Sequence, residues 1–325
     1  MTEMILRDAV AKALREALDT DDRTFLMGED IGAYGGPYAV TRGFLEDYGE
    51  DRIRDTPIAE AVFVGAGTGA AMIGMRPIVE IMTINFSLVA IDQIVNHAAK
   101  LSYMSNGQLS VPLIIRTVTG GGGQLAATHS QSFENWYASI PGLRVVVPAT
   151  PQDALGLFRT CRKDNNPVIF AEHSLLYRVR GDVPEEYYEI PLGQARIARP
   201  GKDVTIVSYS GMVRVAEEAA EKLDELGISA EVIDLRTLSP LDLETVVESV
   251  KKTNRAVVVE ETWKTGGFSG TIASNIQEAA FDDLDGPVLR INGPDVPAPY
   301  ARNIEQAMIP SADWVVESVT YNFGL

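Results

Sequence analysis

Glu60 is the first residue in this sequence whose setting suggests chemistry, because it directly precedes an apolar, glycine-rich run from Ala61 to Met75. Thr68 is the only polar residue of that run, and a helix that is apolar on all sides is buried. Thr56 suits a helix N-cap and Pro57 the first helical position, so Glu60 could simply be a carboxylate that interacts with the helix dipole. Alternatively, Glu60 is a functional acid at the edge of a buried segment, with a pKa raised by desolvation. The residues alone leave both interpretations equally open.

A loop histidine is the second candidate. His129 lies in the segment 128–131 (Thr-His-Ser-Gln), shortly after the glycine cluster Gly120 to Gly123. A glycine-rich loop that follows a strand is where parallel sheets place their ligand sites, although a surface histidine without function fits the same pattern. His97 and His173 are better explained as structural residues. No pair of histidines has the spacing of a zinc site.

The sequence contains no phosphate-binding loop of the Gly-Asp-Gly type. A buried acid and a loop histidine would therefore form only half of a cofactor site, and we expect the other half on a second chain. The run Gly65 to Ala70 does fit the G-x-G-x-x-G/A dinucleotide pattern, with Glu80 as its acidic residue. That pattern would need a strand at Ala61 to Val64, and Glu80 comes too early. Glycines that allow close helix packing are the favoured interpretation, and a nicotinamide-binding dehydrogenase is the remote alternative.

The elements that must position these residues alternate between strand-like and helix-like apolar segments. The strand-like segments are continuously apolar rather than alternating, which is typical of a parallel sheet covered on both faces. The sequence therefore predicts an α/β fold. We expect strands at 24–27, 77–81, 113–116, 144–147, 168–171, 204–207, 230–234 and 256–259, and helices at 9–18, 42–48, after 60, 86–102, 152–163, 213–226 and 241–250.

One stretch, 178–202, differs in character from its surroundings. It carries charges, three prolines and two adjacent tyrosines, which indicate a linker. We expect a first domain over 1–180, a linker over 181–200 and a second α/β domain over 201–325. A chain of 325 residues is long enough for two such cores.

Composition excludes several classes of partner. The net charge of −17 argues against nucleic acid and anionic membranes, which both require a basic patch. Cys161 is the only cysteine, so no disulfide forms within the chain, and a buried thiol in a cytoplasmic protein is the simplest interpretation. The N-terminus resembles no signal peptide, and the longest uncharged apolar run is too short to span a bilayer.

Over nearly its whole length the chain resembles the beta subunit of the thiamine-diphosphate-dependent first component of 2-oxo acid dehydrogenase complexes, of the pyruvate dehydrogenase type. The fold that this implies is an N-terminal pyrimidine-binding domain followed by a transketolase C-terminal-like domain. The segments that carry the resemblance are 55–60 (Asp-Thr-Pro-Ile-Ala-Glu), 92–100, 128–131, 141–148 and 164–167.

The resemblance implies roles for individual residues. Glu60 would hydrogen-bond the aminopyrimidine ring nitrogen of thiamine diphosphate and favour the imino tautomer that removes the thiazolium C2 proton. Ile58, Met82 and Phe86 would line the pyrimidine pocket. His129 would serve proton transfer and orientation when the acyl group passes to a lipoyl arm, a task that suits a group titrating near pH 7.

The resemblance also implies cofactors and partners. The alpha subunit would bind the diphosphate and its magnesium, in an α2β2 tetramer that docks to a lipoyl acyltransferase core. The expected reaction is oxidative decarboxylation of a 2-oxo acid. Pyruvate is the first choice, and branched-chain 2-oxo acids or acetoin are the alternatives. A potassium ion would be held by oxygens at Leu113, Cys161, Arg162, Asp164 and Asn166.

Overall fold

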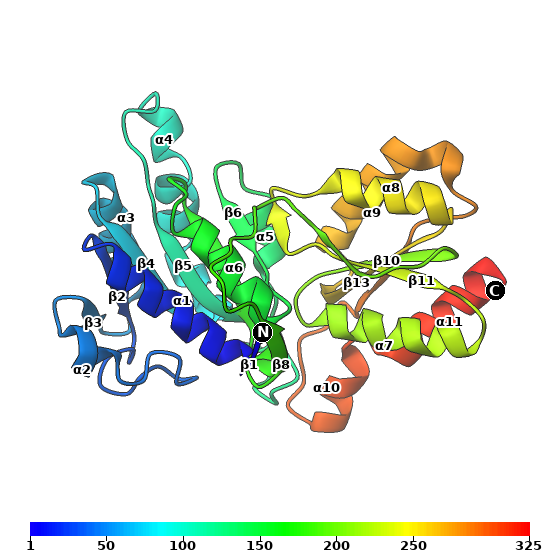
Figure 1. Ribbon diagram of the computed structural model, residues 1–325, viewed down its shortest axis with the longest axis horizontal. Coiled ribbons are helices and arrows are strands. Elements are labelled where there is room, and N and C mark those ends of the chain that lie inside the picture. Colours follow the sequence, from blue (N-terminus) through cyan, green and yellow to red (C-terminus); the bar gives the residue numbers. More distant parts are fainter. The chain divides into compact units, whose positions relative to one another are not determined.

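The computed structural model describes residues 1–325, which form two compact units (Figure 1). The first unit contains residues 1–119 and 136–192, and the second contains residues 120–135 and 193–325. The segment 120–135 therefore makes its contacts with the second unit, although strands of the first unit precede and follow it in the sequence.

A parallel sheet forms the centre of the first unit. Its strands run in the order β6-β7-β5-β4-β2-β3, and every pair is parallel. Most residues of the four central strands are buried, so the expected parallel sheet with two covered faces is confirmed. The strands are β2 (Thr24–Gly28), β3 (Ile53–Asp55), β4 (Arg76–Ile81), β5 (Ile114–Thr119), β6 (Arg144–Val146) and β7 (Val168–His173).

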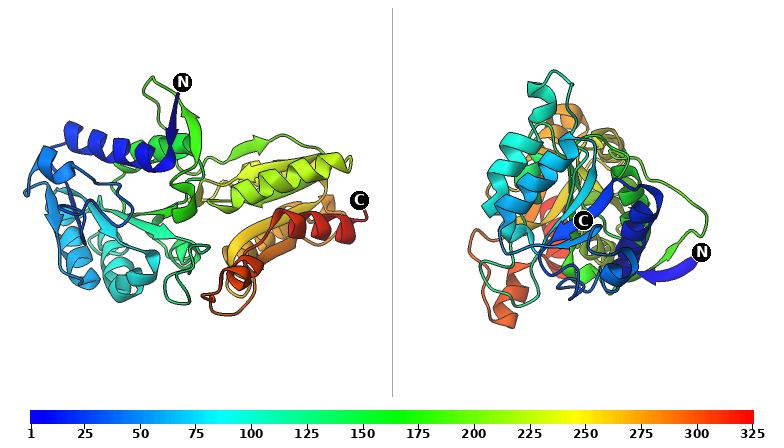
Figure 2. Two further views of the ribbon diagram at one scale, coloured as in Figure 1. Left: turned by 90° about the horizontal axis from the view of Figure 1, so that it is seen from below. Right: turned by 90° about the vertical axis from the view of Figure 1, so that its left-hand side faces the viewer.

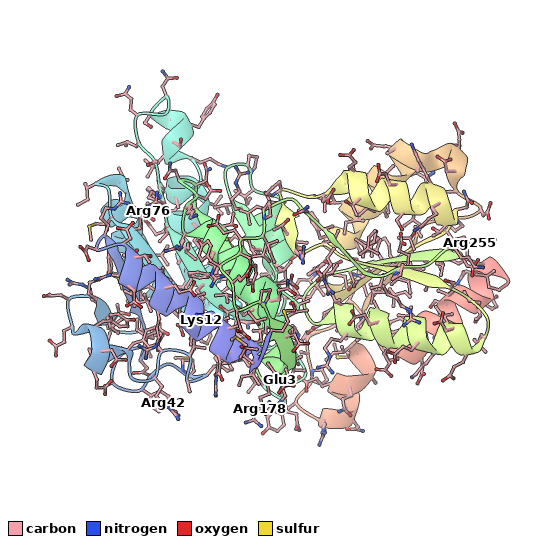
Figure 3. The ribbon with its side chains drawn as sticks, viewed as in Figure 1. Glu3, Lys12, Arg42, Arg76, Arg178 and Arg255 are labelled. Carbon is pink, nitrogen blue, oxygen red and sulfur yellow. The ribbon has the colours of Figure 1, made fainter.

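Helices cover the two faces of this sheet (Figure 2). On one face, α1 (Leu6–Thr20) packs against α6 (Pro151–Cys161) through apolar residues that recur at helical spacing. Lys12 lies on the solvent side of α1, where it pairs with Glu16 at 2.9 Å (Figure 3). On the other face lie α3 (Glu60–Met72) and the short helices η1 (Ile84–Ala90), η2 (Gln93–Ala98) and α4 (Leu101–Met104).

The helix α3 follows Glu60 as expected, but Thr56 does not cap it. The N-cap is Ala59, without a side-chain hydrogen bond, and the hydroxyl of Thr56 is buried without a partner. The glycines of α3 allow it to approach β4 closely. A Cβ atom on Gly67 would lie 2.6 Å from Cγ2 of Val79.

The prediction of a single helix over 86–102 is wrong. The segment forms a 3-10 turn (η1), a π turn (η2) and a short α-helix (α4). Polar side chains within the segment bond locally and compete with regular helix geometry. Ser87 Oγ donates to the carbonyl of Ile84 at 2.5 Å, and Asn96 Nδ2 donates to Asp92 Oδ1 at 2.7 Å.

The second unit is a five-stranded sheet in the order β14-β13-β10-β11-β9, with only β9 antiparallel to its neighbour. Helices α7 and α11 cover one face, and α8 and α9 cover the other (Figure 1). The elements are β9 (Arg196–Arg199), β10 (Val204–Ser208), α7 (Met212–Glu225), β11 (Ala230–Asp234), β12 (Thr237–Ser239), α8 (Leu243–Thr253), β13 (Ala256–Trp263), α9 (Phe268–Ala280), η4 (Phe281–Asp283), β14 (Leu289–Gly293), α10 (Arg302–Met308) and α11 (Ala312–Phe323).

Smaller elements complete the first unit. Strand β1 (Thr2–Ile5) pairs antiparallel with β8 (Arg180–Val183), so β8, like β9, falls within the stretch expected to be a linker. The remaining elements are α2 (Phe44–Tyr48), α5 (Glu134–Ala138) and η3 (Ser174–Leu176). None of the helices in either unit has the length and apolar character that crossing a membrane requires.

Candidate active site

Glu60 is the first residue of α3 and only 4% exposed. Its carboxylate therefore lies where the helix dipole favours negative charge, as the simpler interpretation of the sequence required. Burial at the start of an apolar helix also fits the functional interpretation, because a desolvated acid is a candidate for proton transfer.

A second buried acid, Glu29, accompanies Glu60. It follows the carboxyl end of β2 and is also 4% exposed. Burial and, to a smaller extent, the adjacent Glu60 carboxylate together raise the pKa of Glu29 to about 7. The Oε1 atom of Glu29 has no hydrogen-bond partner. Glu29 thus keeps its proton at pH values where an isolated carboxylic acid has lost it.

The sequence analysis missed Glu29, although one signal was available. Glu29 comes directly after a continuously apolar strand, and functional groups in parallel sheets lie at the carboxyl ends of strands. Gly28, the residue before it, allows close pairing with β4, because a Cβ atom there would lie 2.5 Å from the carbonyl oxygen of Glu80.

The three predicted pocket residues lie on elements that surround the start of α3. Met82 follows β4, and Phe86 belongs to η1; both side chains are half-buried. The helix α3 packs against both β4 and η1. Ile58, two residues before Glu60, is 83% exposed, which is unusual for so large an apolar side chain.

A buried charge network lies in the same sheet, on the face that α1 and α6 cover rather than the face that packs against α3. Arg116 on β5 donates Nε to Glu172 Oε1 at 2.6 Å and Nη2 to Glu172 Oε2 at 2.8 Å, and Nη1 donates to Glu80. The hydroxyl of Tyr177 donates to Glu172 at 2.7 Å. Burial raises the pKa of Glu80 despite the opposing charge of Arg116. Because Glu80 is paired in register with Gly28, this network fixes the strand from which Glu29 emerges.

His129 is exposed and is carried by the segment 120–135 of the second unit. The hydroxyl of Thr128 lies 2.9 Å from His129 Nδ1, and the amide of His129 donates to the carbonyl of Ala126 at 3.2 Å. The first unit thus brings together Glu60, Ile58, Met82 and Phe86, whereas the second carries the predicted histidine.

The oxygens of the predicted potassium site have partners within the protein. Arg76 Nη1 donates to the carbonyls of Arg162 at 2.9 Å and Asp164 at 3.0 Å. The carbonyl of Leu113 accepts from Val168, and that of Cys161 accepts from the Asp164 amide. Oδ1 of Asp164 accepts from the backbone and side chain of Asn166. These are oxygen ligands of the kind that a hard cation takes, and a guanidinium supplies the positive charge here.

Two further interpretations are settled by the fold. Ala61 to Val64 lies within α3, so the strand that a dinucleotide-binding pattern requires is absent and that alternative is wrong. Cys161 is buried, so the expected buried thiol is confirmed, and burial raises the pKa of this thiol. The chain contains no group of three or more His, Cys, Asp or Glu residues placed to hold a metal ion.

Comparison with known families agrees with this architecture. Residues 2–180 match the family model described as "Transketolase, pyrimidine binding domain", and residues 193–315 match "Transketolase, C-terminal domain". The expected succession of a pyrimidine-binding fold and a transketolase C-terminal-like fold is thereby confirmed. A solved chain titled "Split gene transketolase, inactive beta4 tetramer" shares the fold, with a TM-score of 0.79 at 24% identity over 99% of both chains.

Curated proteins are similar over almost the full chain. "Pyruvate dehydrogenase E1 component subunit beta-1, mitochondrial" of Arabidopsis thaliana is 48% identical over 97% of this chain and 88% of its own length. "Pyruvate dehydrogenase E1 component subunit beta" of Rickettsia felis (strain ATCC VR-1525 / URRWXCal2) is 48% identical over 98% of this chain and 97% of its own length.

Proposed function

We propose a function from the premise that the chain belongs to the family of pyruvate dehydrogenase E1 component beta subunits. The chain contributes the pyrimidine half of a thiamine diphosphate site and takes part in the oxidative decarboxylation of pyruvate. The observation that carries this proposal is the pair of buried acids, Glu29 and Glu60, at the start of α3. The relatives cited here favour pyruvate over branched-chain 2-oxo acids and acetoin.

In this proposal Glu60 is the catalytic acid that hydrogen-bonds a ring nitrogen of the cofactor. Donation of this hydrogen bond needs the protonated carboxyl group, and Glu60 is buried at the start of an apolar helix. Glu29 supports Glu60 in this proposal, because its raised pKa keeps a proton beside the Glu60 carboxylate. Of the two acids, only Glu60 would touch the cofactor.

The residues around Glu60 fit an aromatic pyrimidine. Met82 and Phe86 offer half-buried apolar surface next to the buried acid, and Phe86 can stack on a ring. Ile58 adds an exposed apolar side chain at the same end of α3. When bound, thiamine diphosphate supplies the electron sink that makes loss of carbon dioxide from a 2-oxo acid feasible.

We assign His129 to the transfer of the acyl group to a lipoyl arm. In that step one sulfur of the lipoyl disulfide takes the acyl group, the S–S bond breaks, and the other sulfur receives a proton. The two electrons come from the decarboxylated substrate. An imidazole on an exposed loop can reach a substrate delivered on an arm, and it can donate or accept the proton of this step.

A second chain completes the site in this proposal. The sequence lacks a Gly-Asp-Gly motif, so an alpha subunit would bind the diphosphate and magnesium, in an α2β2 assembly that meets a lipoyl acyltransferase. Exposed apolar side chains on neighbouring elements of the first unit support such an interface, because patches of this kind mark protein contacts. They are Ile58, Val62, Val89, Tyr103 and Met104.

Potassium at the oxygens of Leu113, Cys161, Arg162, Asp164 and Asn166 stays a prediction. Four of these groups lie in the turn at the end of α6, whereas Leu113 precedes β5; Arg76 already bonds two of the carbonyls. If a potassium ion binds here, the melting temperature of the assembled enzyme will be higher in potassium chloride than in sodium chloride at equal ionic strength.

Substitution Glu60→Gln in the enzyme assembled with its alpha subunit tests the proposed function. Because the amide cannot supply the same proton, we expect the rate of pyruvate decarboxylation with ferricyanide as electron acceptor to fall by about 10²- to 10⁴-fold. The assembly should remain intact by size-exclusion chromatography. The matched control is Glu46→Gln, an exposed acid on α2, which should retain wild-type activity. Full activity in the Glu60→Gln enzyme would refute the assignment.

A further inference from the structure

The glycine cluster that precedes His129 binds a carboxylate of the protein itself. Residues Gly120, Gly122 and Gln124 have φ angles of 90°, 84° and 58°, and they alternate with residues outside the left-handed region. Such alternation turns successive backbone N–H groups toward one side and forms a concavity that binds anions. Glu305 of α10 fills this concavity. Its Oε1 accepts from the Gly122 amide at 3.1 Å, and its Oε2 accepts from the Gln124 amide at 2.9 Å.

A second carboxylate continues the same arrangement. Glu261 on β13 accepts a hydrogen bond from the Gly121 amide at 2.5 Å. Three amides of the loop therefore point at two carboxylates, and bonds to an ionised acceptor are roughly twice as strong as neutral ones. Glu305 is only 2% exposed, so water competes little for its oxygens.

The other end of the loop also contacts β13 and the residues that follow it in the second unit. The hydroxyl of Thr262 donates to the carbonyl of Ser132 at 3.2 Å, and the rings of Phe133 and Trp263 make an edge contact at 5.7 Å. Asn135 donates to the carbonyl of Gly266 at 3.0 Å. His129 thus lies between two attachment points, one at residues 121–124 and the other at residues 132–135.

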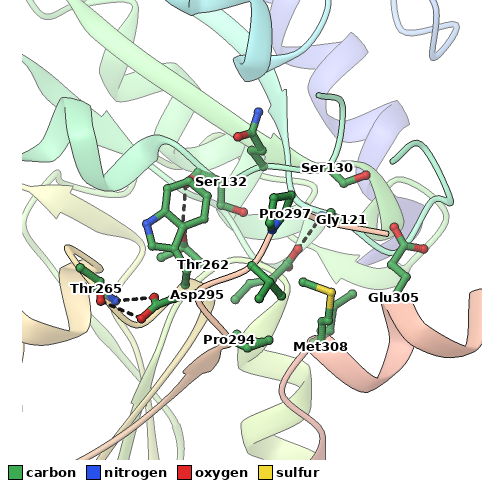
Figure 4. Close-up of a pocket in the computed structure, with 17 residues that line it drawn as sticks. Gly121, Ser130, Ser132, Thr262, Thr265, Pro294, Asp295, Pro297, Glu305 and Met308 are labelled. Atoms are coloured by element: carbon green, nitrogen blue, oxygen red, sulfur yellow. Dashed lines mark hydrogen bonds between the residues drawn. The ribbon is translucent and has the colours of Figure 1, made fainter. Parts of the chain in front are cut away.

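A cavity of about 450 Å³ adjoins the loop within the second unit (Figure 4). Gly121, Ser130 and Ser132 line it on the loop side, and Pro294 and Met308 line it on the other. Because this space is not filled by packed side chains, hydrogen bonds rather than packing fix the position of the loop at Gly121. In Figure 4 the carboxylate of Glu305 lies beside the loop at the edge of the cavity.

We propose that Glu305, assisted by Glu261, is a positioning residue for His129, and that its carboxylate acts through the N–H groups of the glycine cluster. This inference rests on the proposed role of His129 in acyl transfer. It assigns a function to the glycine cluster, which takes no part in the proposed cofactor site. A glutamine at position 305 would turn an NH2 group toward a backbone N–H, and two donors repel each other. The loop would then lose its attachment on one side of the histidine.

The experiment uses the α2β2 enzyme with Glu305→Gln and measures two rates. One is pyruvate decarboxylation with ferricyanide, which needs no lipoyl group, and the other is acetylation of a purified lipoyl domain. We expect lipoyl acetylation to fall by about 10- to 100-fold, because a misplacement of about 1 Å can cost this much. The ferricyanide rate should fall much less. Glu278→Gln, an exposed acid on α9, is the control for the change of charge.

Hydrogen exchange provides a readout that does not depend on turnover. In Glu305→Gln the amides of Gly121, Gly122 and Gln124 should exchange faster, while the strands of the second unit keep their protection. If the two rates fall equally, or if lipoyl acetylation and loop exchange both match the wild type, the positioning role is overturned. Glu305→Asp, which keeps the charge, should recover part of the lost acetylation rate.

Comparison with His129→Gln separates failure of this inference from failure of the proposed function. If His129→Gln acetylates the lipoyl domain at the wild-type rate, the role of the histidine is wrong, and the inference that rests on it is overturned as well. If His129→Gln is impaired and Glu305→Gln is not, only the positioning role is refuted. The double variant should be no slower than His129→Gln alone, because both changes act through the same group.

Discussion

Glu29 holds its proton because two unfavourable effects act on the same carboxylate. Burial removes the water that would stabilise the charged form, and the carboxylate of Glu60 repels a second negative charge. Oε1 of Glu29 accepts no hydrogen bond that would stabilise the charged form. The native chain therefore favours the protonated form of Glu29. In the unfolded chain neither effect acts on this carboxyl group.

The substitution Glu29→Gln should change how the stability of the folded protein depends on pH. The native pKa of about 7 lies above the unfolded value of 4.5, so the native state binds more protons between these pH values. The wild type then loses stability as pH rises from about 4.5 to 7. The glutamine variant does not, because its side chain does not titrate. We expect the melting temperature of the variant, relative to wild type, to be higher by about 2–4 °C at pH 8 than at pH 4.5.

Differential scanning fluorimetry across this pH range measures the effect. Glu46→Gln, an exposed acid on α2, is the control for removal of one negative charge. A melting-temperature difference that stays constant from pH 4.5 to 8 would mean that Glu29 titrates normally in the native state.

At the scale of elements, the contact between α3 and β4 depends on one glycine. The Cβ of a residue at Gly67 would lie 2.6 Å from Val79 Cγ2 and 3.4 Å from Leu113 Cδ1, whereas Gly69, two residues later, has open space around its Cβ position. Both glycines lie within the same helix, so intrinsic helix propensity acts equally on them. Glu60 begins this helix, and its position depends on this contact.

Alanine substitutions at the two glycines should have opposite effects. Gly67→Ala should lower the free energy of unfolding by about 1–3 kcal/mol, because the new methyl group overpacks against β4. Gly69→Ala should raise it by about 0.5–1 kcal/mol through helix propensity alone. Urea denaturation of the purified chain, followed by circular dichroism, measures both. Equal effects at the two positions would argue against close packing of α3 at Gly67.

At the scale of the whole molecule, the chain carries only part of the proposed active site. The two units have separate apolar cores, and the predicted histidine segment makes its contacts with the unit other than the one that holds Glu60. No Gly-Asp-Gly motif occurs in the 325 residues. Exposed apolar side chains on α3 and η1 add a surface that suits burial against another protein.

The isolated chain should therefore bind thiamine diphosphate weakly and should not decarboxylate pyruvate. Isothermal titration calorimetry in the presence of magnesium should detect no binding with a Kd below about 1 mM, since the diphosphate contacts are missing. An alpha subunit that carries the phosphate motif should restore both binding and turnover. Turnover by the isolated chain would show that the site is complete without a partner.

Local pattern in the sequence determined much of this protein. Continuous apolar strands predicted the covered parallel sheet, and the run after Glu60 predicted a buried helix, because both signals arise from residues close together in the chain. The resemblance to the family was carried by five segments together, at 55–60, 92–100, 128–131, 141–148 and 164–167. The acid and the histidine that these segments contain could be selected without knowing how the strands pair.

Only the tertiary structure decided which distant groups meet. Glu29 became part of the site because β2 pairs with β4 and contacts α3. Its place after an apolar strand could mark Glu29 as a candidate, but nothing local to it shows that it meets Glu60. The network of Arg116, Glu80 and Glu172 likewise depends on strands that are far apart in the sequence. The glycine cluster could be recognised in the sequence, but its occupant, Glu305, lies about 180 residues away. Contacts of this kind are fixed by the pairing of non-consecutive elements, which hydrophobic periodicity does not encode.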